Sequence, residues 1–180
     1  MITVTEELRN FAREHATKRM EFEFDRFGLD QTRRHSMIAM GTIGQLAFKQ
    51  FLEMNQVDFE FQLQAGKFDD FDFVINGHIV EIKTSGYGNG SGWKDLNAIY
   101  NSSQLKQAVS KKYFCSVQVF VNGYHRSDKT FDLDNCTTAT IAGWIKIEDI
   151  SAYKPIQLPF SLAHLIPLSE LNEIQSLLKL

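Results

Sequence analysis

The sequence predicts an α/β fold in which a mixed central sheet is flanked by helices. Asn76-Gly77 joins two alternating runs, 70–75 and 78–83, which is the strongest local signal for a hairpin with a two-residue type I′ turn. The apolar run 114–121 predicts a central strand, and the segment 104–113 before it has helical periodicity. A helix between two strands of one sheet makes a crossover connection, so we expect strands 78–83 and 114–121 to be parallel.

Two helices are expected before the hairpin. Thr3 and Glu6 suggest a capping box for a first helix that runs to about Met20. A stronger helix is predicted over 37–53, where a broad apolar stripe follows the helical period. Gly41 and Gly44 lie on one face of it and would let the helix approach the sheet closely.

The other segments complete the order of elements. Alternation over 57–64 predicts a first strand that turns at 66–67 into the hairpin. Glycines at 86, 88, 90 and 92 predict a flexible loop over 87–103, with no element before about Trp93. Segment 124–135 is expected to be an exposed loop, 137–147 a final strand, and Ser169 the cap of a terminal helix.

Length and composition point to one globular domain. The 180 residues are 43% hydrophobic and 23% charged, as is usual for a soluble protein, and the two cysteines do not make a disulfide framework. We expect a helical extension over 1–35, a core over 36–147 and a helical cover over 148–180. The sequence shows neither a membrane span nor a signal peptide, so a cytoplasmic protein without a membrane partner is expected.

The hairpin carries the candidate chemistry. The turn sets Asp72 opposite Glu81 and Asp70 opposite Lys83, and alternation places all four side chains on one face. Carboxylates this close favour a divalent cation between them, and hard oxygen ligands suit Mg²⁺. A lysine beside them can stabilise charge on a phosphate, so the pattern is typical of phosphodiester hydrolysis. Asp70 would replace Asp72 if the turn were longer.

The pattern Asp72-x8-Glu81-Ile82-Lys83 resembles the PD-(D/E)XK nuclease superfamily, whose restriction-endonuclease-like core has the order α-β-β-β-α-β that is predicted here. Phe71 stands at the proline position. The resemblance implies a metal-dependent DNA endonuclease in which Asp72, Glu81 and the carbonyl of Ile82 bind Mg²⁺, with Mn²⁺ as a substitute, and Lys83 assists the attacking water. Taken alone, the motif also fits a solvated hairpin face with a cross-strand ion pair.

The resemblance also assigns a role on the preceding helix. Members often carry a Gly-Glu pair there, and Gly44-Gln45 stands in its place. Gln45 keeps an oxygen that could hold a metal-bound water, but it brings no charge. An ordinary position at the border of the helix is the alternative for Gln45.

Two segments are candidates for DNA contact. The glycine-rich loop carries Tyr87, Trp93, Lys94 and Tyr100, which could close over DNA, or it could be a surface linker with Trp93 anchored in the core. The resemblance implies that Gln104 and Lys106 of the next helix reach DNA near the metal, and a solvated charged face of that helix is the alternative.

The oligomeric state and two alternative functions also follow from the sequence. Cutting two strands implies a homodimer or higher homo-oligomer. A net charge of −3 is unusual for a DNA-binding protein, which leaves a catalytically inactive nucleic-acid-binding or structural module on the same fold as an alternative. A structure-specific nuclease for junctions or ends is the second alternative function.

Overall fold

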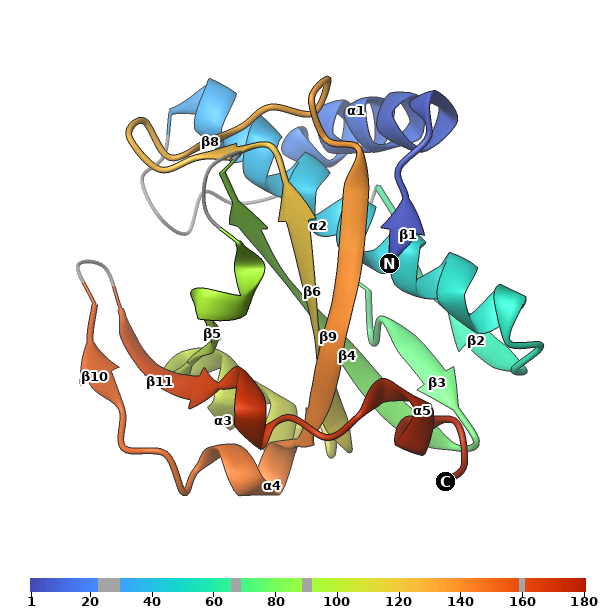
Figure 1. Cartoon of the computed structure of the whole chain (residues 1–180), viewed down its shortest axis with the longest axis vertical. Coiled ribbons are helices and arrows are strands. Elements are labelled where there is room, and N and C mark those ends of the chain that lie inside the picture. The colour runs from blue at the N-terminus through green and yellow to red at the C-terminus, as the bar shows by residue number, and fades with distance from the viewer. Residues whose placement is uncertain (23–29, 66–68, 89–91, 159–160) are drawn as a thin grey trace.

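The computed structural model describes residues 1–22, 30–65, 69–88, 92–158 and 161–180. It is an α/β structure with a six-stranded mixed sheet in the order β1-β9-β6-β4-β3-β2, a three-stranded sheet in the order β10-β11-β5, and a small hairpin of β7 and β8 (Figure 1). The elements are β1 (Ile2–Thr3), α1 (Glu6–Met20), α2 (Gln31–Met54), β2 (Phe59–Phe61), β3 (Phe73–Ile75), β4 (His78–Tyr87), η1 (Trp93–Asp95), β5 (Asn97–Asn101), α3 (Ser102–Ser110), β6 (Cys115–Asn122), β7 (Tyr124–His125), β8 (Thr130–Phe131), β9 (Thr138–Lys146), α4 (Ile147–Ile150), β10 (Ile156–Gln157), β11 (Leu162–Pro167), η2 (Leu168–Glu170) and α5 (Ile174–Leu177).

The predicted hairpin and crossover are confirmed. Phe73 pairs with Val80 and Ile75 with His78, so the register is the one that the Asn-Gly turn predicts. Asn76 has φ 50° and Gly77 φ 78°, the two positive values that a type I′ turn needs. β4 pairs with β6 in parallel, and β9 pairs with β6 antiparallel, which makes the sheet mixed.

Both N-terminal helices begin elsewhere than predicted. The cap of α1 is Thr5, whose side chain accepts from the Leu8 amide, and not Thr3. Thr3 instead pairs with Thr138, because the first residues form an edge strand against β9. The second helix starts at Gln31, after the cap Asp30, whose carboxylate accepts from the Arg33 amide. The first turns of α2 consist of polar residues, so the apolar pattern did not predict this start.

Two apolar layers cover the two faces of the large sheet. On the α2 side, helix residues such as Phe48 and Ile43 pack on Val80, Ile82 and the odd-numbered positions of β6. The second layer is built on Ile145 of β9 and includes Ala98 and Tyr100 of β5 with Ile166 of β11. Because side chains alternate along β4, Glu81 and Lys83 point away from the face that carries Val80 and Ile82.

The second sheet was not predicted, and it corrects three predictions. β9, expected to be the final strand, is followed by β10 and β11. The segment expected to be a loop over 87–103 contains η1 and β5, and β5 pairs with β11 along its whole length. The segment 148–180, expected to be a helical cover, contains β10 and β11, and its last helix, α5, has only four residues with Glu173 at its cap in place of Ser169. The strand predicted over 57–64 is shorter in the structure, where β2 spans Phe59–Phe61. The turn expected at 66–67 lies outside the described residues.

No helix in the described part of the chain has both the length and the apolar character that crossing a membrane would take.

Candidate functional site

The candidate site lies beside the first residue of β3, where the β3–β4 ladder stops while β4 stays paired with β6. This ladder stops at Phe73 and Val80, one residue short of Asp72 and Glu81. At this point the Asp72 side chain, in place of the β3 backbone, bonds to β4: its Oδ2 accepts a hydrogen bond from the Ile82 amide at 2.7 Å. The carboxylate of Asp72 is therefore held against the β4 backbone, between the residues Glu81 and Lys83.

Helix α2 brings Gln45 to the same point. Gln45 Nε2 donates to Asp72 Oδ1 at 2.7 Å. The helix can come this close because Gly44 has no side chain: a Cβ there would lie 1.9 Å from Thr84 Oγ1. The close approach predicted for Gly44 is confirmed, whereas Gly41 has nothing within 4 Å of an added Cβ, so the same prediction for Gly41 is wrong.

The surroundings of Asp72 disfavour the charged form of its carboxyl group. Burial raises the pKa of Asp72 from 3.8 to about 6, and the negative charge of Glu81 adds to the shift. The Ile82 amide, the Lys83 ammonium and the Gln45 amide lower this pKa but do not compensate. A buried carboxyl with this balance gains from a further positive charge beside it.

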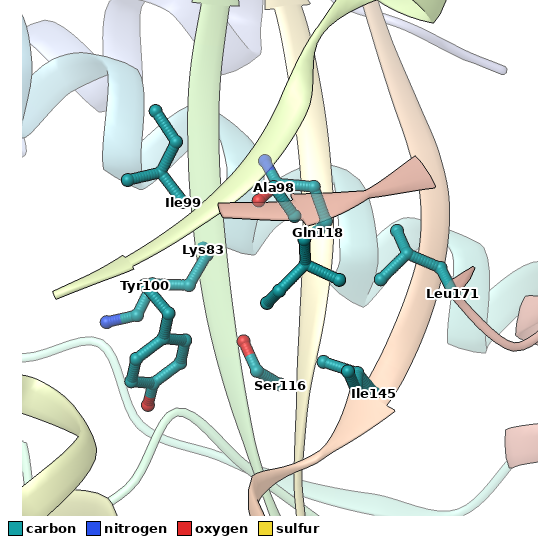
Figure 2. A pocket seen from close by; sticks show the side chains of 9 residues that line it. Lys83, Ala98, Ile99, Tyr100, Ser116, Gln118, Ile145 and Leu171 are labelled. Carbon is teal, nitrogen blue, oxygen red and sulfur yellow. The ribbon is translucent and has the colours of Figure 1, made fainter. Parts of the chain in front are cut away.

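Glu81 and Lys83 form a second, adjoining unit. Lys83 Nζ lies 2.5 Å from Glu81 Oε1, and the two side chains are only 17% and 16% exposed. The hydroxyl of Tyr100 donates to the other oxygen, Oε2, and Lys83 Nζ lies 4.8 Å from the centre of the Tyr100 ring. Figure 2 shows Tyr100 and Lys83 side by side, where β5 crosses over β4.

Two expectations about this unit need correction. Tyr100 was expected on a loop that closes over DNA, but it is 2% exposed, because it lies on a strand paired with β11. Asp70 was expected opposite Lys83, but the ladder ends before it and the residue is exposed. Lys83 pairs with Glu81 instead.

Tyr113 is a neighbour of the site that the sequence did not suggest. Its hydroxyl donates to the Asp70 carbonyl at 2.8 Å. Burial raises the pKa of Tyr113 to about 12, and the charges of Glu81 and Asp72 contribute to the shift. Tyr113 follows α3 in a turn, and no spacing in the sequence links that turn to the hairpin.

The residues expected to contact DNA are spread over three elements. Tyr87 ends β4 and its hydroxyl lies 3.4 Å from Thr138 Oγ1. Trp93 is half-buried and stacks on Phe120 with 5.8 Å between ring centres, as in the core-anchored alternative. Lys94 and Lys106 are exposed, and Gln104 is partly buried on α3.

The donor atoms of the site fit a hard cation. Asp72 and Glu81 supply carboxylate oxygens, Gln45 an amide, and the Ile82 carbonyl is the further oxygen that the resemblance implies. Oxygen ligands of this kind, few enough to leave room for water, suit Mg²⁺ or Mn²⁺. Within the described ranges, no three His, Cys, Asp or Glu side chains gather into a metal-binding group, so any cation here would rely on these two carboxylates.

Compared with protein-family models, with curated proteins and with solved structures, the chain has no significant match in any of the three.

Proposed function

We propose that the chain is a metal-dependent DNA endonuclease with a restriction-endonuclease-like core, similar to the PD-(D/E)XK superfamily. The observation that carries the proposal is the Asp72 carboxylate, held 2.7 Å from the Ile82 amide between Glu81 and Lys83. The elements that form or flank the large sheet follow in the order α2-β2-β3-β4-α3-β6, with β6 parallel to β4, and η1 and β5 are inserted between β4 and α3. This order supports the same assignment.

Each residue has a separable role in this proposal. Asp72, Glu81 and the Ile82 carbonyl would hold Mg²⁺, which supplies Lewis-acid activation of water and neutralises phosphate charge. Lys83 orients the attacking water and stabilises negative charge on the phosphate. Gln45 holds Asp72 in place through its amide. Water adds to phosphorus, one phosphorus–oxygen ester bond breaks, and the products are a phosphate monoester and a free hydroxyl.

The inactive-module alternative also has an observation in its favour. Both oxygens of Glu81 are already bonded, one by Lys83 and one by Tyr100. An ion pair closed in this way satisfies the carboxylate without a metal. The net charge of −3 points in the same direction.

A cleavage assay separates the two. The wild-type chain should cut supercoiled plasmid with Mg²⁺ or Mn²⁺ and stop when a chelator is added. Single-stranded, branched and end-labelled substrates in the same panel distinguish a plasmid endonuclease from a junction or end nuclease. Inactivity on every substrate with either metal would favour the inactive module.

Oligomeric state decides how two strands are cut. Light scattering with DNA present should give a homodimer or larger assembly if one chain cuts each strand. A monomer that nicks only one strand would contradict the proposed dimer.

A further inference from the structure

We infer that Tyr100 is a positioning residue for the Glu81–Lys83 pair. It would fix the orientation of the Glu81 carboxylate and the position of the lysine ammonium. The inference rests on the proposed function, since it concerns the same site.

Tyr100 contacts both members of the pair. Its hydroxyl donates to Glu81 Oε2, while Lys83 takes Oε1 at 2.5 Å. Its ring lies 4.8 Å from Lys83 Nζ, within the range of a cation–π contact. One side chain therefore fixes the rotation of the carboxylate and limits the travel of the ammonium.

Tyr100 is itself held firmly. It is 2% exposed and pairs with His164 of β11, one of five residue pairs that join β5 to β11. His164 is buried and its Nδ1 donates to the Tyr153 carbonyl at 2.6 Å. The Tyr100 hydroxyl thus comes from a fixed layer, and not from a loop that must order first.

The chemistry of the surrounding layer distinguishes a positioning role from packing. The neighbours of Tyr100 in this layer are apolar, for example Ile145, Ile147 and Ile166. A phenylalanine would fill the same volume. Within the described part of the chain, the hydroxyl adds the bond to Glu81, and a buried hydroxyl needs such a partner.

The hydroxyl occupies Oε2 and Lys83 occupies Oε1, so a cation held by Glu81 would bind a carboxylate whose orientation is already fixed. Removing the hydroxyl frees the Glu81 carboxylate to rotate. The geometry of both the metal ligand and the lysine then becomes less defined, which affects the rate more than the binding of DNA.

The test is Tyr100→Phe, with Tyr153→Phe as the matched control because Tyr153 packs against the same apolar cluster. We expect Tyr100→Phe to lower kcat roughly tenfold to a hundredfold. KM for DNA should stay near the wild-type value, while the melting temperature should fall slightly, because Glu81 Oε2 loses its buried partner. Titration calorimetry with Mg²⁺ alone should show weaker binding than in the wild type, whereas Tyr153→Phe should match the wild type in every readout.

The outcomes separate this inference from the proposed function. An active wild type with an unchanged Tyr100→Phe variant would overturn the inference and leave the function standing. A wild type that is inactive on all substrates would contradict the function, and the Mg²⁺ titration would still decide on Tyr100, because equal affinities for Mg²⁺ would overturn its role.

A second measurement leaves Tyr100 unchanged and so does not depend on the folding of the Tyr100→Phe variant. In protein labelled with ¹³C at the tyrosine Cζ, Glu81→Gln should shift the Tyr100 resonance, since the acceptor loses its charge. Addition of Mg²⁺ should shift it in the wild type. A Tyr100 resonance that responds to neither change would contradict the inference.

Discussion

Gly44 of α2 and Thr84 of β4 lie in such close contact that a Cβ on Gly44 would be 1.9 Å from Thr84 Oγ1. This contact sets the distance between α2 and β4. The next residue, Gln45, can reach Asp72 because the helix lies so near the sheet.

Gly44→Ala should therefore destabilise the protein, by about 1–3 kcal/mol, because the new methyl group overlaps the Thr84 side chain. Gly41→Ala is the control: it has open space, and it should raise the free energy of unfolding by up to about 1 kcal/mol through helix propensity. Urea unfolding of both variants checks this, and equal stabilities would contradict the packing described here.

The raised pKa of Asp72 predicts a pH dependence of stability. Without metal, the folded state holds the Asp72 proton up to about pH 6, while the unfolded chain releases it near 3.8. The bound Asp72 proton thus contributes to the free energy of unfolding in full below about pH 3.8, and this contribution is lost as the pH rises to about 6. The loss is roughly 3 kcal/mol at most.

Asp72→Asn does not titrate, so in chelator the stability of the wild type should fall relative to this variant across that interval. Saturating Mg²⁺ should restore the wild type above pH 6 and leave Asp72→Asn unchanged. Parallel stability curves for the two chains would show that Asp72 has an ordinary pKa.

Gln45→Glu would bring a third carboxyl against Asp72, where the Gln45 amide now donates at 2.7 Å. Without metal we expect lower stability, because two carboxylates repel at this distance. With Mg²⁺ we expect tighter binding, measured by calorimetry. Gln45→Ala is the control that removes the hydrogen bond without adding charge, and a Gln45→Glu variant with the Mg²⁺ affinity of Gln45→Ala would count against a metal beside Asp72.

Trp93 and Lys94 are neighbours with different expected roles. Trp93→Ala should lower stability by about 1–3 kcal/mol, because the half-buried Trp93 stacks on the buried Phe120. Lys94→Ala should leave stability unchanged, weaken DNA binding and reduce its salt dependence by about one phosphate contact. Fluorescence anisotropy at several salt concentrations measures this, and an unchanged salt slope would remove Lys94 from the DNA-binding surface.

The hairpin was predictable because its register depends on local chemistry. Asn76 and Gly77 specify a two-residue turn, and the turn sets the pairs that follow. The alternation of side chains then separates Glu81 and Lys83 from Val80 and Ile82. The parallel pairing of β4 with β6 followed from the connection between them.

The second sheet was not predictable in this way. Residues 97–101 alternate between exposed and buried side chains, but they follow a glycine-rich segment and their partner strand lies far along the chain at 162–167. No local signal links the two. Tyr100 owes its contact with Glu81 to this distant pairing, so its place in the site could only come from the structure.

Single-turnover cleavage of plasmid DNA by wild type and Lys83→Ala tests the central claim most directly. Lys83 is paired with Glu81 and is proposed to assist the attacking water. The predicted result is Mg²⁺-dependent cleavage by the wild type and a loss of at least about a hundredfold in Lys83→Ala, with similar DNA binding. Equal cleavage rates for the two chains, or wild-type cleavage that persists in chelator, would contradict it.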